Sequence, residues 1–113
     1  MSDATIDLGT FNELKETAGA DFIQELVQTF LEEAPAMLQE LRDSLAAEDA
    51  NTFRRAAHSL KSNSMTFGAL RLGGMSRELE LNGFAASASP NTLDALEQEY
   101  ARVATTLAEL SHG

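Results

Sequence analysis

The 113-residue sequence contains no cysteine and no tryptophan, and it has only two prolines and one tyrosine. Without cysteine there can be no disulfide, thiol nucleophile or zinc thiolate site, which fits a reducing compartment. No apolar run approaches the length of a bilayer crossing, and the N-terminal residues lack the basic and apolar segments of a signal peptide. We therefore expect a cytoplasmic protein that does not enter a membrane.

Basic residues are also scarce, with 8 Lys+Arg against 18 Asp+Glu and a formal net charge of −10. This charge repels a phosphate backbone at long range, so we do not expect nucleic acid as a partner. The length predicts one small domain over residues 1–113, without a separate nucleotide-binding domain. The ends, from Met1 to a short polar tail, favour a freestanding protein, although a domain of a larger kinase stays open.

Apolar residues recur at helical spacing along the chain, and no segment shows the alternation of a β-strand. Thr10 and Glu13 fit a capping box, which predicts a short helix over about 11–17. The longest periodic segment then predicts a helix over about 22–47, with Asp21 as its N-cap.

Three further features divide the rest of the sequence into helices. Pro35 lacks a backbone N–H, so we expect a kink before it in the long helix. Asp49 is the expected N-cap of the next helix. The inward-facing stripe of that helix is Phe53, Ala57, Leu60, Ser64 and Phe67. A further helix is expected over about 69–82, and after a connection of small residues the last helix begins at Pro90.

These segments together predict an all-α fold. Four long amphipathic helices with short connections are typical of an antiparallel four-helix bundle. We expect the bundle core to cover about 21–111, and the short additional N-terminal helix to act as a lid.

One segment of the sequence contains no acidic residue. From Ala50 to Arg77 there is no Asp or Glu, yet five of the eight basic residues lie there. His58 stands inside this positive window. Because a neutral, nucleophilic imidazole is plentiful near neutral pH, the combination points to chemistry on an anionic group such as phosphoryl.

The position of His58 on its helix follows from the rotation of about 100° per residue. His58 points about 140° away from the apolar stripe and should therefore face solvent. The residues that share its side of the helix are Arg54, Arg55, Lys61, Ser62 and Met65. Cations thus flank the imidazole, and Met65 offers an adaptable apolar contact, as expected of a docking surface around a nucleophile.

The segment AAHSLKSNSMTFGALRLGGMSRELE, from Ala56 to Glu80, resembles the signature of histidine-containing phosphotransfer (HPt) domains of two-component phosphorelays. The matching residues are Ala57, His58, Leu60, Lys61, Ser64, Gly68, Ala69, Leu72, Leu79 and Glu80. The resemblance extends over nearly the whole chain. One position departs from the pattern, because Ser62 stands where the family usually has glycine. Its hydroxyl is small and could donate a hydrogen bond to a phosphoryl oxygen.

The resemblance implies that His58 accepts a phosphoryl group from the aspartate of a receiver domain and passes it to another receiver. It implies Nε2 as the attacking atom, with Lys61 and Arg54 or Arg55 stabilising the phosphoryl group or steering the partner. The expected partners are response-regulator receivers or a hybrid histidine kinase. The protein would be a phosphocarrier without kinase activity of its own, with no cofactor and with Mg²⁺ on the receiver.

A second interpretation of the basic face stays open. The protein could be a helical adaptor that docks receivers or other acidic domains through the same face without accepting phosphate. No metal site is expected. His58 and His112 are the only histidines, so a catalytic zinc would have to recruit carboxylates without a recognisable spacing, and the single E-x-x-H of Glu109 and His112 lacks the second copy that a di-iron bundle needs. We expect a monomer, because the cationic His58 face would not pair comfortably with itself.

Overall fold

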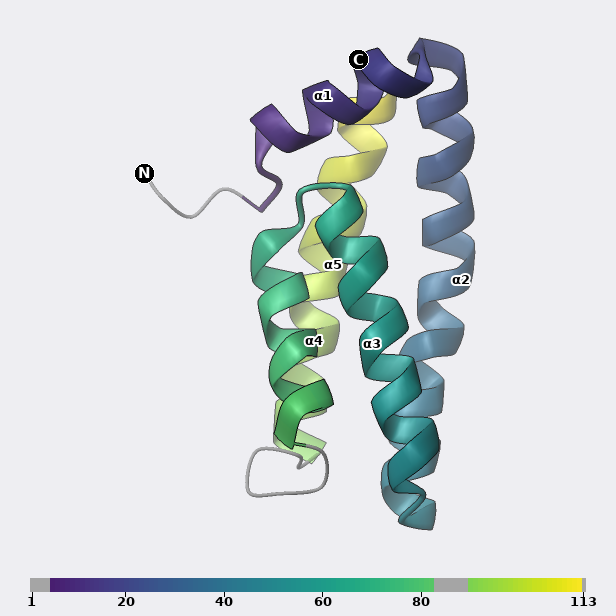
Figure 1. The fold of residues 1–113 in the computed structure, drawn as a ribbon, viewed down its shortest axis with the longest axis vertical. Coiled ribbons are helices and arrows are strands. Elements are labelled where there is room, and N and C mark those ends of the chain that lie inside the picture. The colour runs from purple at the N-terminus through teal and green to yellow at the C-terminus, as the bar shows by residue number, and fades with distance from the viewer. Residues whose placement is uncertain (1–4, 83–89, 113) are drawn as a thin grey trace.

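The protein is described by a computed structural model that covers residues 5–82 and 90–112 (Figure 1). Within those ranges the chain forms five α-helices and no strand. The helices are α1 (Leu8–Ala18), α2 (Ala20–Ala47), α3 (Ala50–Thr66), α4 (Leu70–Asn82) and α5 (Pro90–His112). No helix of the described ranges is long and apolar enough to span a membrane.

The four longer helices form an antiparallel bundle. Helix α3 packs against α2 and α4, and α5 packs against the same two helices on the other side, which closes the ring. Helix α1 packs on α2 and α3 and lies across the end of the bundle at which α5 terminates (Figure 1). The predicted bundle with an additional N-terminal helix is therefore confirmed.

Apolar faces of the helices meet along the bundle axis. All five residues of the predicted stripe on α3 are buried. On α5 the buried apolar residues are Leu93, Leu96, Val103 and Leu107. Phe30 of α2 links distant parts of this core, since its ring centroid lies 5.3 Å from that of Phe67 and 6.0 Å from that of Tyr100. Met75 of α4 packs against this core but is only partly buried.

The helix ends agree with the sequence at some positions and differ at others. Asp49 caps α3 as predicted, because its carboxylate accepts the backbone N–H of Thr52 at 3.2 Å. Pro90 begins α5, whereas the predicted connection over 83–89 lies outside the described residues. Helix α2 continues through Pro35 as one element.

The start of α1 corrects the predicted capping box. Asp7 caps the helix, because its carboxylate accepts both the backbone N–H (3.1 Å) and the hydroxyl (2.6 Å) of Thr10. Thr10 is therefore a donor inside the helix and not its cap. Asp21 is also not a cap, since α2 begins at Ala20 and Gly19 occupies the capping position without a side chain. In both places the capping residue stands two or three positions earlier in the chain than the residue that was predicted to cap the helix.

The turn between α3 and α4 requires glycine. Gly68 has a φ of 85°, in the left-handed region that other residues rarely adopt. Its carbonyl accepts the backbone N–H of Asp7 at 2.7 Å, which fixes the start of α1 to this turn. A Cβ added at Gly68 would lie 2.7 Å from the carbonyl oxygen of Asp7. The turn therefore sets how α4 returns along α3 and where α1 sits.

We expect Gly68→Ala to lower the free energy of unfolding by about 1–3 kcal/mol, because alanine is strained at this φ and collides with Asp7. Gly74→Ala is the matched control on α4, where an added Cβ has no atom within 4 Å. It should raise stability by about 0.5–1 kcal/mol, since alanine favours a helix interior over glycine. Urea unfolding of the two variants beside the wild type measures both effects. Equal responses of the two variants would contradict the assigned role of the turn.

Candidate functional site

His58 lies on the solvent side of α3, as the helical rotation predicts. Its side chain is 57% exposed, whereas its neighbours Ala57 and Leu60 are fully buried. The buried neighbours fix the rotation of α3 about its axis, because turning the helix would expose them to water. The imidazole is therefore held at the surface by the packing of the opposite face of its own helix.

A carboxylate from α4 binds the imidazole. Nδ1 of His58 lies 2.7 Å from Oε2 of Glu80, and the ammonium of Lys61 lies 2.8 Å from the other oxygen, Oε1. The second contact is an ion pair without the alignment of a good hydrogen bond. The Glu80 side chain is only 19% exposed. The negative charge of a carboxylate with so little exposure must be compensated, and His58 and Lys61, one turn apart on α3, provide that compensation.

The electrostatics of Glu80 follow from these contacts. Lys61 lowers the pKa of the Glu80 carboxyl below its ordinary value, and His58 lowers it further. Partial burial opposes the shift but does not overcome it. Glu80 is therefore a carboxylate at neutral pH, which can accept a hydrogen bond but cannot donate one.

The contact with Glu80 assigns the tautomer of His58. Because an ionised carboxylate only accepts, the hydrogen between the two groups belongs to Nδ1 of the ring. In the neutral ring the other nitrogen, Nε2, then carries the free lone pair. No residue of the described ranges forms a hydrogen bond with Nε2. The arrangement presents a nucleophilic nitrogen to solvent.

The other predicted site residues fall into two groups. Lys61 is 26% exposed and paired with Glu80, so the structure joins it to His58 through the carboxylate. Arg54 and Arg55 are exposed on α3, where Arg54 makes only a long hydrogen bond of 3.4 Å to Asn51. Ser62 is exposed one turn after His58. The two arginines and Ser62 therefore flank the imidazole without being fixed to it.

Met65, the last predicted site residue, rests on a glycine. Its side chain is 47% exposed, and its sulfur would lie 2.5 Å from a Cβ added at Gly73 of α4. Gly73 thus leaves room for the thioether on the surface between the two helices. An apolar, polarizable side chain therefore lies two turns after the imidazole on the same side of the helix.

The sequence analysis missed the roles of Glu80 and Gly73. Glu80 was part of the matching signature but was not assigned to the site, because its partner lies 22 positions away in the chain. The available indication was the polar carboxylate itself, which stands directly after the buried Leu79 at the end of the basic window. Gly73 gave no sequence indication beyond the pair it forms with Gly74.

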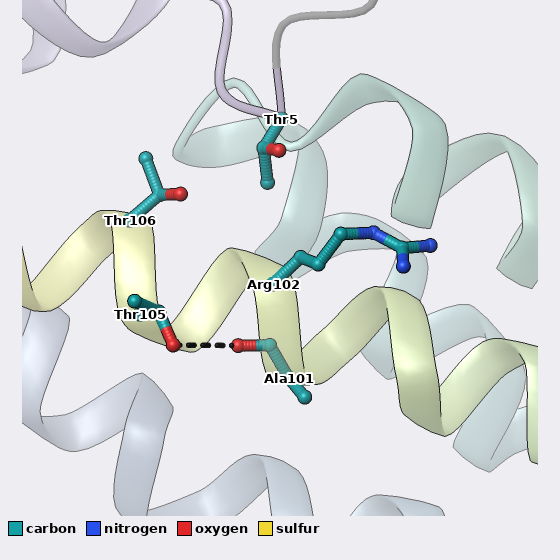
Figure 2. A pocket seen from close by; sticks show the side chains of 5 residues that line it. All are labelled: Thr5, Ala101, Arg102, Thr105 and Thr106. Atoms are coloured by element: carbon teal, nitrogen blue, oxygen red, sulfur yellow. Dashed lines mark hydrogen bonds between the residues drawn. The ribbon is translucent and has the colours of Figure 1, made fainter.

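A pocket elsewhere in the described structure lacks such chemistry. An open pocket of about 370 Å³ lies beside α5, lined by Thr5, Ala101, Arg102, Thr105 and Thr106 (Figure 2). Its one charged side chain, Arg102, is bound to the buried carboxylate of Glu99 at 2.7 Å. Across the described part of the chain, no three His, Cys, Asp or Glu side chains are grouped to hold a metal ion.

The comparisons with known proteins agree with this geometry. The family model of the Hpt domain matches residues 25–110. The chain belongs to the Hpt domain family. That match includes the whole of α3 and α4, and therefore His58, Lys61 and Glu80.

Two relatives of this Hpt domain are informative. The crystal structure of histidine-containing phosphotransfer protein B (HptB) from Pseudomonas aeruginosa PAO1 superposes with a TM-score of 0.88 at 30% identity, covering 98% of this chain and 97% of HptB. Sensor protein TorS of Escherichia coli (strain K12) is 31% identical over 67 residues, which are 59% of this chain and 7% of TorS. The chain thus spans the length of HptB but a small part of TorS.

The lowered pKa of Glu80 predicts how the free energy of unfolding depends on pH. The folded protein holds the charged form more tightly than the unfolded chain does, so this contribution is present above the ordinary glutamate pKa and is lost as pH falls through the lowered one. We expect the wild type to exceed Glu80→Gln in free energy of unfolding at about pH 6, and the difference to shrink between about pH 5 and pH 3.

Urea unfolding across that pH range measures the difference. Glu78→Gln is the matched control, because Glu78 is exposed on the same helix and forms no ion pair within the described ranges. Its difference from the wild type should stay small and nearly constant with pH. A Glu80→Gln difference that did not depend on pH would contradict the assigned ion pairs.

Proposed function

We propose that this Hpt domain accepts a phosphoryl group on Nε2 of His58 from the aspartyl phosphate of a receiver domain and passes it to another receiver. The observation that carries the proposal is the exposed imidazole whose Nδ1 is bound to Glu80 and whose Nε2 has no hydrogen bond to any residue of 5–82 and 90–112. Membership of the Hpt family and the likeness to a histidine-containing phosphotransfer protein support it. The partners would be receiver domains and the histidine kinases that carry them.

The chemistry follows from the ring geometry. Nε2 attacks phosphorus in line, so that an N–P bond forms as the P–O bond to the partner's aspartate breaks and that carboxylate leaves. His58 keeps the hydrogen on Nδ1, and the ring becomes positive. Glu80 lies 2.7 Å from that nitrogen and offsets the new charge, so the hydrogen bond strengthens as the transition state forms. Transfer to a second receiver reverses these steps.

The energy source in this scheme is the phosphoryl donor itself. The aspartyl phosphate is an activated mixed anhydride, so the step needs no nucleotide on this protein. We propose that the receiver holds the Mg²⁺ and that this domain contributes the nucleophile and its positioning. Arg54 and Arg55, which form no ion pair within the described part of the chain, would attract the acidic metal-binding site of the receiver.

Replacing the acceptor tests the proposal directly. Receiver domains charged with a small acyl phosphate and Mg²⁺ are mixed with the wild type, His58→Gln and the matched control His112→Gln. Intact mass and acid lability should show one phosphoryl group on the wild type and on His112→Gln, and none on His58→Gln. Glutamine keeps polarity at an exposed position, so folding should be unchanged.

The same samples separate transfer from docking. If His58→Gln binds charged receivers normally and no protein becomes phosphorylated, the helical adaptor is the better account. Phosphorylation of His58→Gln would instead assign the acceptor to another residue. Loss of binding by His58→Gln would show that the imidazole serves docking, contrary to the proposed role as nucleophile.

Removing the carboxylate tests how Glu80 acts. We expect Glu80→Gln to slow transfer by about tenfold or more, since hydrogen bonds to charged groups contribute about 1.5–3 kcal/mol. Nitrogen-15 NMR of the free protein should show the Nδ1–H tautomer in the wild type and a larger share of Nε2–H in the variant. A slow variant with an unchanged tautomer population would assign the effect to docking or folding and not to ring orientation.

A further inference from the structure

The contacts between α3 and α4 fix the register of the two helices. His58 meets Glu80, and seven residues further along α3 Met65 meets Gly73, which is seven residues earlier on α4. The two helices are therefore antiparallel, and each step along α3 is matched by one step back along α4. Three positions after His58 on α3 is Lys61, and three positions before Glu80 on α4 is Arg77. Arg77 thus lies one turn from Glu80, at the level of Lys61.

The rotation of α4 turns Arg77 toward the solvent side of this contact. Leu72, Ser76 and Leu79 face the core and are buried. Arg77 is about 60° from Glu80 around the helix, on the side away from those residues, and it is exposed. Its side chain therefore leaves α4 at the rim of the surface that carries the imidazole, one turn from the carboxylate that binds the ring.

Arg77 has no partner within residues 5–82 and 90–112, whereas four of the eight Lys and Arg residues form ion pairs there. Arg42 is paired with Asp94 and Glu97, and Lys61 with Glu80. Arg71 and Arg102 both bind Glu99. The guanidinium of Arg77 keeps all five donors and its full charge. A planar guanidinium presents paired donors to phosphoryl oxygens, a geometry that an ammonium lacks.

Exposed leucines stand on either side of Arg77. Leu70 is 47% and Leu81 is 64% exposed, and helical rotation places both on the same side of α4 as Arg77. The two leucines therefore border the part of α4 that a partner docked at His58 would cover. A receiver that delivers its phosphoryl group to His58 is the occupant that this face fits, because its acidic, metal-binding site complements the free arginines.

We propose that Arg77 binds the phosphoryl oxygens carried on Nε2 of His58. Helix α4 would then supply both the carboxylate that orients the ring and the guanidinium that holds the transferred group. The inference rests on the proposed transfer at His58. It gives the contact with the phosphoryl group to Arg77 and not to Lys61, whose ammonium is already occupied by Glu80.

A phosphorus NMR titration tests the contact without a partner. The purified protein is phosphorylated with phosphoramidate, and the pKa of the phosphohistidine is followed in the wild type and in Arg77→Gln, Arg77→Lys and Lys15→Gln. A nearby guanidinium favours the doubly charged phosphoryl group, so Arg77→Gln should raise that pKa by about half a unit or more. Arg77→Lys should raise it less. Lys15→Gln removes the same charge from α1, across the end of the bundle, and should leave the pKa unchanged.

Transfer kinetics distinguish a phosphoryl contact from a docking contact. At saturating receiver, Arg77→Gln should slow transfer about fivefold or more, with Lys15→Gln near the wild-type rate. If Arg77→Gln and Lys15→Gln form phosphohistidine at the same rate and with the same pKa, the role of Arg77 is wrong, whereas the proposed transfer at His58 stands. A change only in apparent receiver affinity would also overturn that role, since Arg77 would then touch the partner. A wild type that is never phosphorylated on His58 would overturn the proposed function first.

Discussion

A half-covered carboxylate shared between two residues of the neighbouring helix is the interaction on which this site depends. Glu80 places one oxygen against Nδ1 of His58 and the other against the ammonium of Lys61. Removing a carboxylate from water is unfavourable unless its charge is compensated, so both contacts favour the packing of α4 against α3. One side chain therefore ties the orientation of the imidazole to the packing of the bundle.

Small residues between α3 and α4 make that contact possible. Gly73 and Ser76 of α4 are buried, as is Ser64 of α3, whose Cβ would lie 3.7 Å from a Cβ added at Gly73. The hydroxyl of Ser76 bonds back to the carbonyl of Leu72 at 2.8 Å, whereas that of Ser64 has no hydrogen-bond partner in the described structure. The close approach of the helices thus leaves one polar atom uncompensated, and it brings a glutamate within reach of a histidine on another helix.

The sequence predicted the features that depend on one helix at a time. Helical rotation alone placed His58 in solvent and the stripe from Phe53 to Phe67 in the core, because burial of an apolar face decides both. The pairing of His58 with Glu80 depends instead on the register between two helices, which the turn at Gly68 determines through its backbone conformation. Lys61 shows the same limit, since its side of α3 was predictable but its partner on α4 was not.

Helix α4 is restrained about its own axis from two opposite directions. Arg71 reaches Glu99 of α5 at 3.8 Å, and Glu80, half a rotation around the helix from Arg71, binds α3 at the other end of α4. A twist of α4 that improved one of these pairs would move the other group along with it. The direction in which the His58 ring points therefore depends on a helix to which the histidine does not belong, and through that helix on the packing of α5.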